Sequence, residues 1–215
     1  MIDFSNVCFG YGEISVLKNV SFHIKKGEFA AVLGANGAGK TTTIRMLSCL
    51  CTPSSGKAFI YGNDISKNKA AAKKLLNISP QETAVAKNLT VRENLMFIAG
   101  IYGSDKKSAA EKTDRIIDSL SMQEIASDKA GILSGGWQRR LSIAMALITE
   151  PSVLFLDEPT LGLDVLARRE LWNIISGLKG KTTIILTTHY LEEAEALSDR
   201  IARSEEPRLN SSHRL

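Results

Sequence analysis

The sequence of 215 residues lacks a long hydrophobic run. A membrane-spanning helix needs ~18 successive apolar residues, and candidate segments such as 94–104 and 141–149 are much shorter. The first residues, Met-Ile-Asp-Phe, have neither the basic start nor the apolar stretch of a secretory signal. The sequence therefore predicts a soluble chain that is neither inserted in a membrane nor exported.

Cysteine and charge of one sign are also scarce. The chain has three cysteines, Cys8, Cys49 and Cys51, and neither their odd number nor their spacing fits a disulfide framework or a usual metal site. The net charge of +4 is spread along the chain, so no basic stripe indicates nucleic acid. Hydrophobic residues make up 44% and charged residues 23%, which is typical of a globular protein and excludes disorder.

Short apolar runs that alternate with helical stretches predict an α/β fold with a mostly parallel sheet. Residues 29–33 are wholly apolar, as in a strand that is covered on both faces, and residues 153–156 and 183–186 repeat this pattern. Between these runs we predict helices at 40–50 and 165–178. Ligands of such sheets bind beyond the carboxyl ends of the strands.

The middle of the chain has a different character. A capping-box pattern begins at Thr90 ahead of residues 94–101, and residues 109–120 have the apolar spacing of an amphipathic helix. A further helix is expected at 141–148. We therefore predict that residues 85–150 form a helical subdomain inserted into a core of residues 1–84 and 151–202.

Residues 34–41, Gly-Ala-Asn-Gly-Ala-Gly-Lys-Thr, match the phosphate-binding loop pattern in full and lie between a predicted strand and a predicted helix. The glycines allow successive backbone N–H groups to point at phosphates, and the helix N-terminus adds its dipole. Lys40 is expected to reach the β and γ phosphates, and the Thr41 hydroxyl is expected to ligate Mg²⁺. The residues predicted to bind the nucleotide here are Gly34, Asn36, Gly37, Ala38, Gly39, Lys40, Thr41 and Thr42.

A second chemical motif follows the apolar run at 153–156. Asp157 and Glu158 lie at its carboxyl end, where Asp157 is suited to hold Mg²⁺ and Glu158 to activate water as a general base. Without other motifs, an Asp-Glu pair after a strand would indicate only a solvent-exposed loop. Together with a complete phosphate-binding loop it predicts a hydrolysis site.

Further motifs resemble those of ABC-type ATPases. Residues 133–138, Leu-Ser-Gly-Gly-Trp-Gln, resemble the signature sequence of that family. Gln81 resembles the Q-loop glutamine, Asp164 belongs to a D-loop-like Leu-Gly-Leu-Asp, and His189 resembles the switch histidine. Tyr11 matches the aromatic residue that stacks on adenine. The motifs occur in family order and span residues 2–202, so the resemblance is specific as a set.

The resemblance implies a P-loop NTPase core with an N-terminal antiparallel β region and an inserted helical subdomain. It implies that two such domains bind head to tail and close over two ATP molecules with Mg²⁺. The catalytic residues would be Glu158, His189 and Gln81, and the metal would be held by Thr41, Gln81 and Asp157. The further nucleotide contacts would come from Tyr11, Ser134, Gly135, Gly136 and Asp164.

Two motifs depart from the commonest family pattern. Trp137 stands where glutamine usually follows the second glycine, and the D-loop region lacks the usual Ser-Ala. Both variants look like those of ATPases that serve drug, lipid or polysaccharide exporters. Taken alone, Tyr11 and His189 also fit ordinary structural roles, as a loop tyrosine and a strand-end histidine.

The predicted function is the ATP-hydrolysing subunit of an ABC-type transporter, at the cytoplasmic face of the cell membrane. Its expected partners are a second copy or a homologous ATPase subunit, and a separate integral-membrane permease that docks near Gln81 and residues 85–94. Contact with the membrane is expected only through the permease, and none is expected with nucleic acid. The alternative is a soluble ABC-type ATPase that acts on ribosomes or DNA.

The end of the chain does not read as part of the domain. Residues 203–215 are polar, contain Pro207 and have one large aliphatic residue, Leu209, before the terminal leucine. We predict that this segment is a non-native or disordered tail, and that the lack of a continuing apolar strand leaves an exposed sheet edge or apolar patch.

Overall fold

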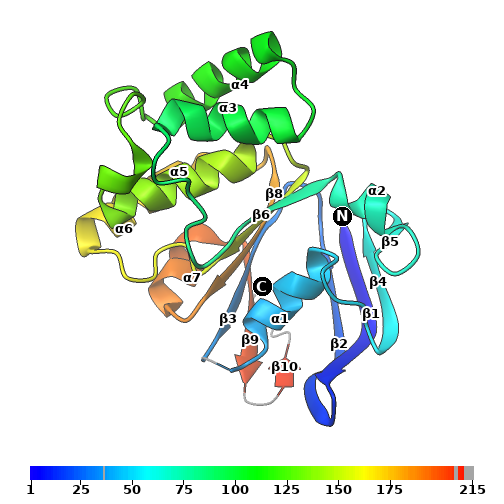
Figure 1. The fold of residues 1–215 in the computed structure, drawn as a ribbon. Helices are drawn as coiled ribbons and strands as arrows, with labels where there is room; N and C mark the ends of the chain where they lie inside the picture. Colours follow the sequence, from blue (N-terminus) through cyan, green and yellow to red (C-terminus); the bar gives the residue numbers. More distant parts are fainter. Residues whose placement is uncertain (36, 206–207, 211–215) are drawn as a thin grey trace.

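The computed structural model describes residues 1–35, 37–205 and 208–210, which form two sheets with helices packed between and beside them (Figure 1). The first sheet is antiparallel, in the order β2-β1-β4-β5. Its strands are β1 (Ile2–Tyr11), β2 (Ile14–Ile24), β4 (Ser55–Ile60) and β5 (Asn63–Asp64). The predicted N-terminal antiparallel region is therefore present.

The second sheet has the order β10-β9-β3-β8-β7-β6 and is parallel except for β10. Its strands are β3 (Phe29–Gly34), β6 (Leu76–Ser79), β7 (Val153–Asp157), β8 (Thr183–Thr188), β9 (Arg200–Glu205) and β10 (Arg208–Asn210). Strands β7 and β8 are buried along their whole length, as expected for central strands of a parallel sheet that is covered on both faces. The α/β class with a mostly parallel sheet is confirmed.

Helix α1 (Lys40–Leu47) lies between the two sheets (Figure 1). Its buried Ile44, Met46 and Leu47 belong to the same hydrophobic core as Phe4 of β1 and Ile185 of β8. This core fixes α1, and with it the loop before Lys40, against both sheets.

The other helices complete the chain. They are α2 (Lys69–Lys73), α3 (Val91–Ile101), α4 (Lys106–Ser119), α5 (Gly135–Leu147), α6 (Val165–Ser176) and α7 (Leu191–Leu197), with a 3₁₀ turn η1 (Ala130–Ile132). In residues 85–150, all of them described, the regular elements are helical, and α3 and α4 lie at the top of Figure 1, far from the antiparallel sheet. The division into core and inserted subdomain stays a prediction.

The predicted capping box before α3 is confirmed. Thr90 accepts a hydrogen bond from the Glu93 N–H, and the Glu93 carboxylate accepts one from the Thr90 N–H. Buried Asn94 then joins the helix to the preceding loop, because its side chain bonds both the N–H and the C=O of Ala86. These contacts fix the segment that follows Gln81.

Regular structure extends past residue 202, and the non-native or disordered character of residues 203–215 stays a prediction. Strand β9 runs to Glu205 and pairs with β3 as far as Ser204 opposite Gly34, and β10 pairs back onto β9. The physical reason is that the edge of β3 offers backbone partners whatever the side chains are. Residues 206–207 and 211–215 lie outside the described residues.

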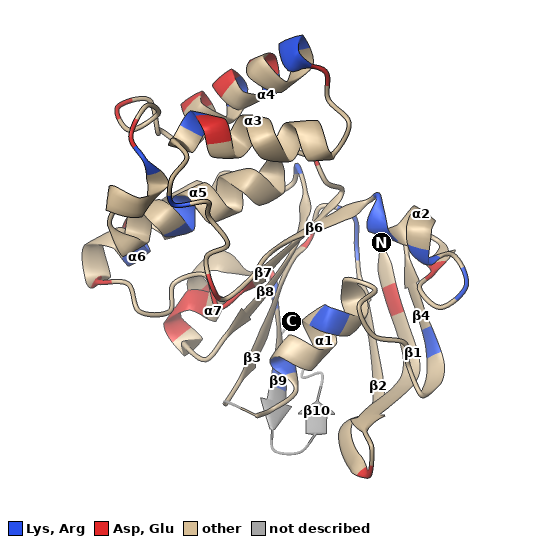
Figure 2. Cartoon of the chain, viewed as in Figure 1, with Lys and Arg blue, Asp and Glu red and all other residues tan. Residues whose placement is uncertain are grey.

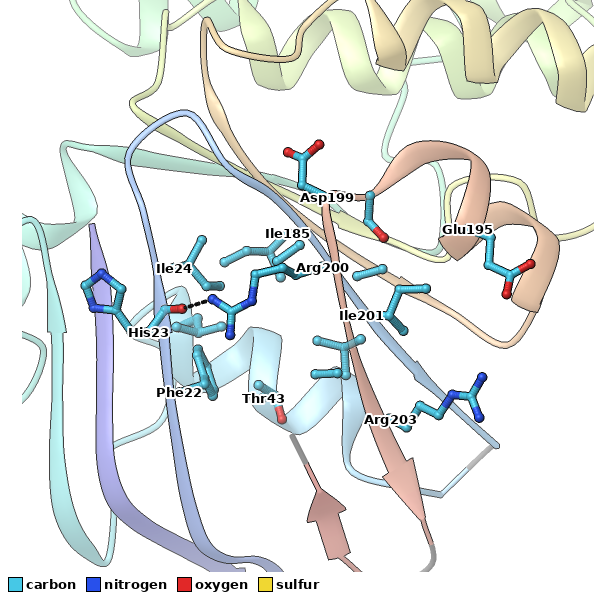
Figure 3. Close-up of a pocket in the computed structure, with 16 residues that line it drawn as sticks. Phe22, His23, Ile24, Thr43, Ile185, Glu195, Asp199, Arg200, Ile201 and Arg203 are labelled. Carbon is cyan, nitrogen blue, oxygen red and sulfur yellow. Dashed lines mark hydrogen bonds between the residues drawn. The ribbon is translucent and has the colours of Figure 1, made fainter. Parts of the chain in front are cut away.

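A hollow of about 580 Å³ lies between β2, β9 and α1 (Figure 3). Phe22, Ile24, Ile185 and Ile201 contribute apolar side chains to it, and the Arg200 guanidinium donates a hydrogen bond to the His23 carbonyl at one side. Among the described residues that line it, none belongs to the predicted site. The hollow is therefore separate from the phosphate-binding loop.

Candidate nucleotide-hydrolysis site

Four of the predicted motifs leave the carboxyl ends of neighbouring parallel strands. The phosphate-binding loop follows β3, Gln81 follows β6, Glu158 follows β7 and His189 follows β8. The register aligns these ends, because Leu33 pairs with Thr188 and Asp157 pairs with Thr187. Parallel pairing therefore collects motifs that are far apart in the sequence at one edge of the sheet.

The phosphate-binding loop is a turn that glycine makes possible. Gly37 and Gly39 have φ angles of 88° and 82°, in the left-handed region that residues with a Cβ rarely adopt. The Ala38 N–H bonds the Ala35 carbonyl, and the Gly39 carbonyl receives the first helical bond from the Thr43 N–H. Asn36 lies outside the described residues. The loop thus ends directly at the N-terminus of α1, with Thr41 exposed and Thr42 half-buried there.

Lys40 extends from α1 back over the loop. Its ammonium donates hydrogen bonds to the carbonyls of Gly34 at 2.7 Å and Ala35 at 3.0 Å. It also forms an ion pair with Glu158, with 3.2 Å between Nζ and Oε1, and both side chains are more than nine-tenths buried. Water screens the attraction in such a buried pair little, and this attraction offsets the cost of removing both charges from water.

Glu158 occupies a strained turn after β7. Its φ of 46° lies in the left-handed region, which is costly for a residue with a side chain. The turn is stabilised by the Glu158 N–H, which bonds both the carbonyl and the hydroxyl of Thr187. As a result the carboxylate meets Lys40 on one oxygen and His189 Nδ1, at 2.8 Å, on the other.

Asp157 points from the same strand end. One of its carboxylate oxygens accepts a hydrogen bond of 2.5 Å from the Thr187 hydroxyl. The side chain is almost fully buried, which keeps its orientation fixed. The structure therefore brings Lys40, Asp157, Glu158 and His189 together, as the sequence predicted.

The predicted signature segment forms the start of α5. Ser134 is its N-cap, and its hydroxyl accepts a hydrogen bond from the Trp137 N–H at 3.5 Å. Ser134 and Gly135 are exposed. Gly136 is tightly packed, because a Cβ there would lie 3.1 Å from the Ala167 Cβ of α6. In Figure 1, α5 lies in the upper half of the molecule and α1 in the lower half.

Asp164 and Gln81 are both exposed in loops that border this region. Asp164 caps α6, since its carboxylate accepts hydrogen bonds from the N–H groups of Leu166 and Ala167. The backbone carbonyl of Gln81 accepts a hydrogen bond from the Arg139 guanidinium. The structure thus assigns structural contacts to both residues, and their roles toward nucleotide and metal stay predictions.

Comparison with known proteins decides the family. The family model described as ABC transporter matches residues 17–161. The chain belongs to the ABC transporter family.

Three named relatives of this ABC chain are proteins of transport or resistance. It is 38% identical over 193 residues to phospholipid-transporting ATPase ABCA3 of Homo sapiens, with 90% of this chain and 11% of the relative covered. It is 40% identical over 195 residues to the doxorubicin resistance ATP-binding protein DrrA of Mycobacterium tuberculosis, covering 90% and 59%. The Nod factor export ATP-binding protein I of Burkholderia orbicola is 41% identical over 209 residues, covering 96% and 68%. The chain thus spans from about a tenth to two thirds of the length of these relatives.

Solved structures agree with the family fold. One is an ATP-binding cassette in a dimeric post-hydrolysis state bound to ADP and Pi, with a TM-score of 0.86, 25% identity and coverage of 100% of this chain and 99% of that chain. Another is the ATP-binding subunit of an ABC transporter, with a TM-score of 0.85, 28% identity and coverage of 100% and 90%. The predicted P-loop fold is confirmed.

The oxygen groups of this ABC domain fit Mg²⁺. The Thr41 hydroxyl, the Asp157 carboxylate and the Gln81 amide are hard oxygen ligands, which Mg²⁺ prefers. No cluster of three or more His, Cys, Asp or Glu residues suited to a metal occurs in the described part of the chain.

Sequence reasoning missed two buried charged residues beside the site. Arg139 of α5 is 4% exposed, and burial lowers the pKa of its guanidinium to about 10, although Asp157, Glu193 and Glu158 oppose this shift. Glu193 of α7 is fully buried and accepts hydrogen bonds from the Thr160 hydroxyl and the Trp172 indole N–H. In the sequence, the available signal for Arg139 and Glu193 is a charged residue among the apolar positions of a helix.

Charge and hydropathy add two observations. Lys and Arg are interspersed with Asp and Glu on the described elements, most clearly along α4 (Figure 2).

Within the described residues, every helix is too short or too polar to cross a bilayer.

Tyr11, at the end of β1, allows a separate test of the adenine contact. Its ring is 45% exposed and packs edge-on against Phe9, with 5.0 Å between ring centroids. We expect Tyr11→Ala to weaken ATP binding about fivefold, because a stacking contact contributes roughly 1 kcal/mol. Tyr11→Phe retains the ring and should bind like wild type. Titration with a fluorescent ATP analogue measures both, and equal affinity of Tyr11→Ala and wild type would remove Tyr11 from the site.

Proposed function

We propose that this chain is the ATP-binding and hydrolysing subunit of an ABC-type exporter, and that it drives a separate permease. The observation that carries the proposal is the contact of Glu158 with both Lys40 and His189 at the mouth of a complete phosphate-binding loop. The names of the relatives, which include resistance and export proteins, support an exporter. They give no support to the alternative on ribosomes or DNA.

The proposed chemistry is attack of water on the γ-phosphate, which breaks the bond from the γ-phosphorus to the bridging oxygen and releases ADP and phosphate. The loop N–H groups and Lys40 bind the phosphates, and Glu158 accepts a proton from the attacking water. His189 donates a hydrogen bond to the γ-phosphate once it is released from Glu158. Mg²⁺, held by Thr41 and Asp157 with Gln81, neutralises charge on the phosphates when it is bound.

Two copies are proposed to assemble head to tail, with Ser134 of each copy facing the phosphate-binding loop of the other. The exposed N-terminus of α5 supports this, since the N–H groups of Gly135 and Gly136 in its first turn suit a phosphate. Exposed apolar side chains beside Asp164 also support it, because Val165 and Leu166 are 60% and 74% exposed. A related cassette forms a dimer bound to ADP and Pi.

The permease is proposed to dock on α3, which follows the Q-loop and presents an apolar outer face. Phe97, Ile101 and Tyr102 are each more than half exposed on this helix and its C-terminal end. Such clustered aromatic and aliphatic side chains are typical of an interface. This docking would place the chain at the cytoplasmic side of the membrane, where ATP is available.

The test is co-purification with the membrane protein encoded beside this chain, together with phosphate release. We expect Phe97→Asp to weaken the complex about 30-fold, because a buried aromatic anchor contributes about 2 kcal/mol. The isolated variant should still hydrolyse ATP like wild type. Ile14→Asp, at a more exposed apolar site in the β1–β2 hairpin, is the control and should retain the complex. Retention of the complex by Phe97→Asp would contradict the docking site.

A further inference from the structure

The guanidinium of Arg139 is bonded on every nitrogen to backbone carbonyls of the hydrolysis site. Nε donates to the Pro159 carbonyl at 2.8 Å, and Nη2 donates to the Asp157 carbonyl at 2.6 Å. Nη1 donates to the carbonyls of Pro80 and of Gln81, the latter at 3.1 Å. One side chain of α5 therefore joins the segment after β6 to the segment after β7.

Two of these carbonyls flank Glu158 on either side in the chain. Glu158 itself has the left-handed φ of 46°, a conformation that persists only where surrounding contacts impose it. The Glu158 N–H is bonded to Thr187 from β8. Arg139 therefore supplies, from α5, the contacts that hold the carbonyls of the residues before and after the strained residue.

An apolar side chain of similar volume would fill the space of Arg139 without the cost of a buried charge. The planar fork of arginine is required because four carbonyls in different directions need donors at once, which the single ammonium of lysine does not match. The nearby carboxylates of Asp157, Glu193 and Glu158 partly offset the lowering of the guanidinium pKa by burial. The guanidinium therefore fixes the relative positions of the four carbonyls.

We propose that Arg139 is a positioning residue that couples the signature helix α5 to the general base Glu158. Because α5 begins at Gly135, directly after its N-cap Ser134, and Arg139 lies about one turn later, a displacement of the signature end shifts the guanidinium. The shift is passed to the Glu158 turn and to the Gln81 backbone through the same four hydrogen bonds. The inference rests on the proposed hydrolysis, and it assigns a role to a residue outside the family motifs.

The experiment compares Arg139→Lys with Arg140→Lys, a matched substitution at the next position of α5. Arg140 is also buried, but it bonds Glu170 and stacks on Trp137, away from the Glu158 turn. We expect Arg139→Lys to lower kcat about 10- to 100-fold with KM within about twofold, because a small misplacement of a catalytic group has such an effect. Arg140→Lys should stay within about threefold of wild type.

A second measurement separates positioning from a general loss of stability. In the Glu158→Gln background, Arg139→Lys should cause no further loss of single-turnover rate, since the group on which it acts is gone. A full additional loss there, or an equal loss in Arg140→Lys, would overturn the proposal.

The proposal can also be tested without turnover, so that it does not fail merely because the proposed function fails. Hydrogen exchange should rise in Arg139→Lys at the amides of 158–163, where Leu161 and Leu163 bond within the turn, and stay unchanged in α4. Unchanged exchange at 158–163 would overturn the proposal. A wild-type chain that releases no phosphate would contradict the proposed function alone.

Discussion

Replacing Glu158 by Gln is expected to lower the rate of ATP hydrolysis by at least about 100-fold, because a general base contributes two or more orders of magnitude. The amide keeps the shape of the carboxylate but has no basic oxygen to accept the proton of the attacking water. ATP affinity should change little, since the loop N–H groups and Lys40 remain. The variant should therefore accumulate as an ATP-bound dimer, which size-exclusion chromatography with ATP detects.

The control for Glu158→Gln lies at the other end of the same strand. Glu150 precedes β7, has a φ of 52° and is exposed, with an ion pair to Arg115. Glu150→Gln makes the same chemical change on a similarly strained backbone and should retain full turnover. Turnover of Glu158→Gln within a few-fold of wild type would exclude Glu158 as the base.

Mixing two inactive variants is expected to restore hydrolysis if the site is shared between copies. Lys40→Ala removes the phosphate ligand, and Ser134→Arg fills the exposed start of α5. In a head-to-tail heterodimer both changes fall in one site and the other site is intact. An equal mixture should therefore recover about a quarter of wild-type turnover, since half the dimers are mixed and each has one of two sites.

Each variant alone supplies the baseline for this experiment, and both should be nearly inactive. Monomeric Ser134→Arg should still bind ATP, because Ser134 lies on α5 and not on the loop before α1. A mixture no more active than the sum of the two variants would contradict the shared site. Ser134 is preferred over Gly136 here because any side chain at Gly136 would also collide with Ala167.

Much of the fold was predictable because its signals are local. The apolar runs of β3, β7 and β8 and the capping box of α3 each appear within a few residues of sequence, and the structure has them. Strand β1 was not recognised, because its bulges against β2 and β4 interrupt the alternation of buried and exposed residues. Helix α5 begins at Gly135, ahead of the apolar pattern at 141–148, and the two glycines at 135 and 136 weaken the local helical pattern there.

The sequence by itself determined the chemical groups of the site. The glycine-rich loop, Lys40, Asp157 and Glu158 follow from spacing and residue type, because a phosphate-binding loop needs its glycines and lysine at fixed positions. The tertiary structure alone decided that Glu158 contacts both Lys40 and His189. It also decided that Arg139 bonds the backbone carbonyls on either side of Glu158. Those contacts join residues from different strands and helices, so they depend on strand order and on the packing of α5, which no local pattern encodes.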